Sequence, residues 1–153
     1  MGYYFQAIDT NDFINKFSLE NYVETGTGEG ATLEHSMRHS FENFYSIEIH
    51  EKIYEFAKEK FDRLSKLYRR ECTVLHGNSY EKLPSVLSEL DGNTFFFLDA
   101  HFPGADFKFS SYGDTEDYDT RLPLEREVSI IINNRDISGD VFIIDDLVIF
   151  EPD

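Results

Sequence analysis

The chain has 153 residues, of which 41% are hydrophobic and 16% aromatic, and we expect one folded domain spanning 1–153. The formal net charge of −16 repels phosphate backbones and anionic lipids, which argues against nucleic acid or a membrane as a partner. The charge suits a small-molecule substrate, although solubility alone also accounts for it. A single cysteine, Cys72, excludes an internal disulfide. The sequence shows no signal peptide and no apolar run of membrane length, so we expect a cytoplasmic protein.

Short apolar runs alternate with longer amphipathic stretches along the chain. We predict helices over 9–17, 29–40, 51–67, 80–90 and 122–134, and strands over 21–24, 43–49, 72–76, 94–99 and 141–145. Strand and helix therefore alternate five times, which predicts an α/β fold with a parallel sheet and helices on both faces. The segment 101–121 has no periodicity and many acidic residues, so we predict a long loop there.

A glycine-rich turn joins the first predicted strand to the next helix. It reads ETGTGEG over 24–30, and its candidate ligand-binding residues are Glu24, Thr25, Gly26, Gly28 and Gly30. Glycines let the backbone turn sharply and approach a ligand closely. The third glycine comes one residue too early for the Gly-x-Gly-x-x-Gly pattern of dinucleotide sites. The carboxylates in and before the turn would repel a pyrophosphate but attract a sulfonium or an ammonium group. The turn therefore indicates an S-adenosylmethionine site.

Polar residues also end the second and third predicted strands. Glu48 follows the glycines by about 20 residues, where a carboxylate accepts hydrogen bonds from ribose hydroxyls; an ordinary exposed glutamate is the alternative. Asn78 and Ser79 follow the third strand and would face an adenine ring. Either side chain can accept a hydrogen bond from the amino group of adenine. Ser79 is equally well suited to be a helix N-cap.

Carboxylates gather after the fourth and fifth predicted strands. Asp99 and His101 follow the fourth strand, and Asp145 and Asp146 follow the fifth. Three carboxylates at neighbouring strand ends repel one another unless a proton or a cation lies between them. Oxygen ligands suit Mg²⁺, and His101 is a candidate general base or further ligand. The alternative is that Asp145 and Asp146 only cap the next element or hold a turn.

The order of these motifs resembles that of class I S-adenosylmethionine-dependent methyltransferases, from about residue 20 to residue 147. The resemblance implies a Rossmann-like three-layer αβα sandwich with a mostly parallel sheet in the order 3-2-1-4-5. It places the methyl donor at the C-terminal ends of the strands, with Glu48 on the ribose. It also implies that Glu24, Gly26 and Gly28 lie near the methionine moiety.

The carboxylate pattern is similar to that of the metal-dependent O-methyltransferases of catechol and sugar type. Asp99 and Asp145 match the aspartates of that pattern, whereas Asp146 stands where it has an asparagine. The resemblance implies O-methyl transfer to a small hydroxylated acceptor. In that chemistry a metal-bound hydroxyl loses its proton, here to His101, and attacks the sulfonium methyl.

Methyltransferases of this class normally carry seven strands, and we predict five. We expect the sixth and seventh to be lacking here, because the given sequence ends at 153, soon after the fifth. We expect a natural short form, a truncation or a fragment. A partner chain covering the exposed fifth strand would make a homodimer. The alternative to an active enzyme is a non-catalytic domain that keeps only the donor site. The glycine spacing disfavours a nicotinamide-dependent oxidoreductase.

Overall fold

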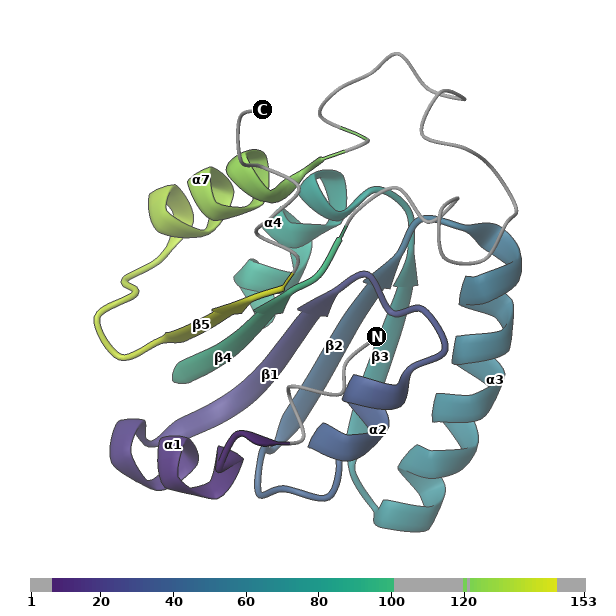
Figure 1. Ribbon diagram of the computed structural model, residues 1–153, viewed down its shortest axis with the longest axis horizontal. Helices are drawn as coiled ribbons and strands as arrows, with labels where there is room; N and C mark the ends of the chain where they lie inside the picture. The colour runs from purple at the N-terminus through teal and green to yellow at the C-terminus, as the bar shows by residue number, and fades with distance from the viewer. Residues whose placement is uncertain (1–6, 101–119, 121, 146–153) are drawn as a thin grey trace.

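The computed structural model describes residues 7–100, 120 and 122–145 (Figure 1). The predicted loop over 101–121 therefore lies outside the described residues, apart from Thr120. In chain order the elements are α1 (Thr10–Phe17), β1 (Leu19–Thr25), α2 (Ala31–Ser36), β2 (Asn43–Glu48), α3 (Glu51–Tyr68), β3 (Glu71–His76), α4 (Ser79–Glu89), β4 (Asn93–Leu98), α7 (Leu124–Asn134) and β5 (Val141–Ile144). None of the described helices is both long and apolar enough to cross a membrane.

The strands form one parallel sheet in the order β3-β2-β1-β4-β5 (Figure 1). This confirms the predicted α/β fold and its strand order. A helix connects each strand to the next, as parallel pairing requires. The order changes direction at β1, which has β2 on one side and β4 on the other. Such a switch point, at the C-terminal ends of the strands, is where sheets of this kind bind ligands.

Two hydrophobic cores lie on opposite faces of the sheet and make the three layers. Side chains alternate between the faces along a strand, so Tyr22 of β1 enters one core and Val23 the other. The first core packs the sheet against α1, α2 and α3 and is rich in stacked aromatic rings. The second packs the sheet against α4 and α7. Strand β4 is buried almost throughout, as its apolar sequence predicts.

The element boundaries differ from the prediction in two informative places. The predicted helix over 29–40 is shorter, because α2 begins only after Gly30 and ends at Ser36. Beyond α2 the backbone bonds run three residues back, from Arg38 to His35 and from His39 to Ser36, so the helix tightens into turns. Strand β1 starts at Leu19, two residues earlier than predicted.

Candidate functional site

The glycine turn after β1 is held between the ends of β2 and β4. The amide of Gly26 donates to the carbonyl of Ile47 at 2.9 Å, and the amide of Asp99 donates to the carbonyl of Thr25 at 3.1 Å. Gly26 has a φ of +80°, and a Cβ atom there would lie 2.6 Å from the carbonyl oxygen of Asp99. Both the left-handed backbone and the missing space require glycine at this position.

The rest of the turn also has a left-handed backbone at its glycines. Gly28 and Gly30 have φ values of +52° and +72°, and Gly30 occupies the N-cap position of α2. The hydroxyls of Thr27 and Ser46 lie 2.6 Å apart, which links the turn to β2. The turn is thus fixed to the sheet by both its backbone and its side chains.

Glu24 is buried on the α2 and α3 side of β1, with only 1% of its surface exposed. Its carboxyl oxygens accept hydrogen bonds from the Tyr22 hydroxyl at 2.8 Å and the Ser46 hydroxyl at 2.9 Å. Burial raises the pKa of Glu24 to about 8. The side chain is therefore mostly neutral at pH 7, and its role differs from the bare negative charge that the sequence suggests. It fixes the end of β1 against β2.

Glu48 joins two loops at the end of β2. One of its carboxylate oxygens accepts from the amide of Gly28 at 3.0 Å, and the other accepts from the amide of His50 at 2.8 Å. Only 3% of the residue is exposed. The alternative of an ordinary exposed glutamate is therefore wrong. A carboxylate has about four acceptor positions, so these two bonds leave acceptor capacity for a ligand hydroxyl.

Asn78 and Ser79 lie where the sequence predicts, at the turn from β3 into α4. Asn78 takes the N-cap position and Ser79 is the first helical residue, so the alternative of Ser79 as the N-cap is wrong. The side-chain amide of Asn78 donates to the Thr120 hydroxyl at 3.2 Å, and the Tyr80 hydroxyl lies 3.4 Å from the same oxygen. The start of α4 therefore holds Thr120 in place.

Asp99 and Asp145 follow neighbouring strands, as predicted. The amide of Asp145 donates to the carbonyl of Leu98 at 3.1 Å, which continues the pairing of β4 with β5. The other two residues of the predicted cluster, His101 and Asp146, lie outside the described residues. Within the described part of the chain no group of three or more histidine, cysteine or acidic side chains is arranged to hold a metal ion. The metal site stays a prediction.

Sequence reasoning missed Glu127, a fully buried acid in α7. The Thr25 hydroxyl donates to its Oε2 atom at 3.3 Å, while its Oε1 atom has no hydrogen-bond partner among the described residues. Burial raises the pKa of Glu127 to about 7. One signal was available in the sequence. Glu127 precedes Ile131 by four residues and therefore shares the apolar, core-facing side of the helix.

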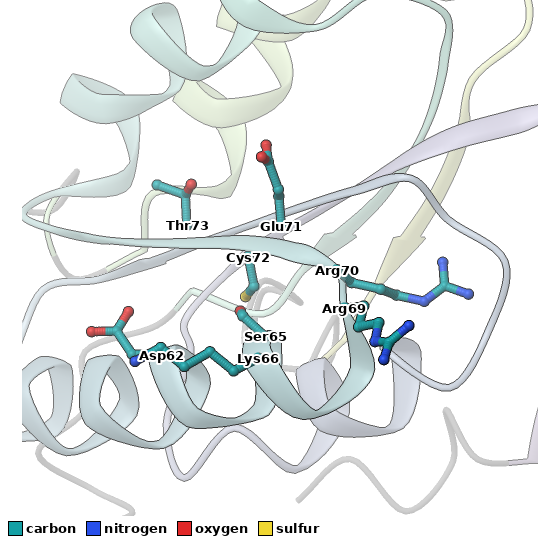
Figure 2. A pocket seen from close by; sticks show the side chains of 8 residues that line it. All are labelled: Asp62, Ser65, Lys66, Arg69, Arg70, Glu71, Cys72 and Thr73. Carbon is teal, nitrogen blue, oxygen red and sulfur yellow. The ribbon is translucent and has the colours of Figure 1, made fainter.

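A pocket of about 630 Å³ lies elsewhere, between the end of α3 and the start of edge strand β3 (Figure 2). Its lining includes three cationic side chains, Lys66, Arg69 and Arg70, and the thiol of Cys72. Burial raises the pKa of that thiol to about 12, so it stays protonated and is a poor nucleophile. The pocket is at the N-terminal end of β3, away from the glycine turn.

The fold is similar to those of solved methyltransferase structures. One is the methyltransferase domain of bacterial CtHen1-CN, with 15% identity, a TM-score of 0.51, and coverage of 80% of this chain and 56% of that one. Another is an O-methyltransferase from Bacillus cereus in complex with SAH, with 20% identity, a TM-score of 0.50, and coverage of 80% of this chain and 66% of that one. The match therefore spans less than two thirds of either structure. No family model and no curated protein matches the sequence. At these identities the similarity establishes the class I methyltransferase fold and not a shared activity.

Proposed function

We propose that this protein binds S-adenosylmethionine and transfers its methyl group to a small hydroxylated acceptor. The observation that carries the proposal is the glycine turn at the switch point of the sheet, joined through Gly28 to the carboxylate of Glu48. The similarity in fold to the two solved structures also supports this proposal, since both are methyltransferases.

The donor site is proposed along the C-terminal ends of β1, β2 and β3. Glu48 would accept hydrogen bonds from the ribose hydroxyls, because its carboxylate is already oriented by two backbone amides. The turn from Glu24 to Gly30 would hold the methionine moiety with its backbone. Asn78 and Ser79 would face the adenine ring. The residues present therefore fit the donor in type and in order along the sheet.

The acceptor site is proposed beside β4 and β5. The donor, when bound, supplies an electrophilic methyl group on a sulfonium. Asp99 and His101 would orient the acceptor hydroxyl and take its proton. Asp99, Asp145 and Asp146 offer the oxygen ligands that Mg²⁺ prefers. Support for this half comes from the neighbouring strand ends that carry Asp99 and Asp145.

A second candidate function is donor binding without catalysis. The observation that favours it is the bonded framework of the donor side, where Glu48 accepts from the amides of Gly28 and His50. A homodimer in which a second copy covers the outer edge of β5 would supply further surface for an acceptor. Sedimentation with and without the donor would separate a dimer from a monomer.

The decisive variant for the donor site is Glu48→Gln, with Glu51→Gln as its matched control. Glu51 is exposed in the first turn of α3, so its loss removes the same charge nearby. Each hydrogen bond to a charged group contributes about 1.5–3 kcal/mol, so we expect Glu48→Gln to weaken donor binding by about tenfold or more. Equal affinity in the two variants would refute the ribose role of Glu48.

The metal proposal is tested by thermal unfolding with added Mg²⁺. A bound ion stabilises the folded state, so Mg²⁺ raises the melting temperature of the wild type and has no effect on Asp99→Ala. An unchanged melting temperature in both proteins would remove the metal from the proposal and leave donor binding untouched.

A further inference from the structure

Glu127 connects three elements that meet beneath the proposed donor site. It lies in α7 with 0% of its surface exposed. The last residue of β1, Thr25, donates a hydrogen bond to its Oε2 atom at 3.3 Å. Ser79, the buried first residue of α4, also interacts with the Glu127 carboxyl and lowers its pKa against the larger effect of burial. One side chain thus contacts β1, α4 and α7.

Thr25 and Ser79 belong to the two turns that the proposed donor would span. Thr25 immediately precedes Gly26, and Ser79 immediately follows Asn78. Strand β2 lies between β1 and β3 in the sheet, so no ladder of hydrogen bonds joins these turns directly. Glu127 reaches both from the helical layer. It therefore links two turns that the sheet leaves separated by a full strand.

Burying this carboxyl is unfavourable for folding. Both its oxygens are removed from water, and Oε1 has no hydrogen-bond partner within the part of the chain that the structure describes. An apolar residue at this position would continue the core-facing side of α7 with Ile131 and avoid that cost. Buried polar groups that break the local pattern in this way are typical of functional sites. Glu127 is therefore better explained by its contacts with the two turns than by core packing.

We infer that Glu127 is a positioning residue that sets the separation between the glycine turn and the start of α4. The inference rests on the proposed donor site. S-adenosylhomocysteine spans both turns, with its amino-acid end at the glycine turn and its adenine at α4. Joining two fragments strengthens binding only when the spacing of their sites matches the linker. Loss of Glu127 therefore weakens the spanning ligand and leaves a fragment that contacts one turn unaffected.

The test compares S-adenosylhomocysteine with adenosine by calorimetry, well below the melting temperature. For Glu127→Ala we expect the dissociation constant of S-adenosylhomocysteine to rise about tenfold and that of adenosine to change less than twofold. Glu127→Gln keeps an oxygen that accepts from Thr25, so it binds S-adenosylhomocysteine within about threefold of the wild type. Glu125→Gln, on the exposed side of the same helix turn, is the matched control and leaves both ligands unchanged.

Three results would overturn the inference. They are an unchanged affinity of Glu127→Ala for S-adenosylhomocysteine, equal weakening of both ligands, or failure of Glu127→Gln to restore binding. Should Glu127→Ala fail to fold, Thr25→Val removes the same hydrogen bond at nearly constant volume. This variant must then bind S-adenosylhomocysteine more weakly while its affinity for adenosine changes little. A wild type that binds neither ligand would instead refute the proposed function.

Discussion

The close approach of the β1 turn to the end of β4 predicts a large penalty for Gly26→Ala. An alanine at φ +80° costs about 1–2 kcal/mol for the left-handed backbone alone. Its Cβ atom would also lie 2.6 Å from the Asp99 carbonyl oxygen and 3.2 Å from the Cα atom of Ala100, both backbone atoms that cannot rotate away. Forced backbone displacement adds strain of about 1–3 kcal/mol. We therefore expect a loss of about 2–5 kcal/mol in the free energy of unfolding.

Gly92→Ala is the matched control, because Gly92 has the same φ of +80°. A Cβ atom there meets only the carboxyl end of the flexible Glu20 side chain, which can move aside. Gly92→Ala should therefore lose only the about 1–2 kcal/mol that the left-handed backbone costs, without the clash. For a chain of this length about 1 kcal/mol shifts the melting temperature by about 2–4 °C. Urea titration followed by circular dichroism measures both variants. Equal losses in the two would show that the β1 and β4 turns are not in close contact.

Two further predictions concern the buried acidic residues Glu24 and Asp140. Because burial raises the pKa of Glu24 to about 8, the folded state binds more protons than the unfolded state between about pH 4.5 and 8. The contribution of Glu24 to the free energy of unfolding is therefore fully present below about pH 4.5 and is lost as the pH rises through 8. In urea titrations across this range, Glu24→Gln makes the free energy of unfolding fall less steeply with pH. An identical pH dependence in the variant and the wild type would contradict the raised pKa of Glu24. Asp140, whose side chain is 1% exposed, accepts from the Thr94 amide at 2.8 Å and pairs with Arg135 at 2.9 Å. Asp140→Ala leaves that cation unpaired and costs about 3 kcal/mol, whereas Asp62→Ala in an exposed ion pair costs less than about 1 kcal/mol; similar losses would show that the Asp140 pair is solvated.

The sequence was sufficient for the architecture and for the position of the glycine turn. Periodicity located every described strand within about two residues, because each strand is a short apolar run between helical patterns. The turn was identifiable because glycine is the residue that its left-handed backbone requires, and Glu48 because of its distance from that turn. These features depend on local sequence and on the order of elements.

The environment of the acids was not predictable in the same way. The sequence predicts a negative charge beside a ligand at Glu24. In the structure its carboxyl group is hydrogen-bonded by Tyr22 and Ser46, and Ser46 belongs to a different strand. Glu127 looked like one more acid in the first turns of a helix, where acids are common. Its burial results from the packing of α7 over Thr25, a residue about 100 positions earlier in the chain. Such long-range contacts set the pKa values and leave no local pattern.

The central claim is that the glycine turn binds S-adenosylmethionine, and titration calorimetry of the folded wild type tests it most directly. S-adenosylmethionine and S-adenosylhomocysteine should each give a saturable heat with one site per chain, and NAD⁺ should give none. Binding of NAD⁺ in preference to both, or no heat from either methionine-derived ligand while circular dichroism shows an intact fold, would contradict the account.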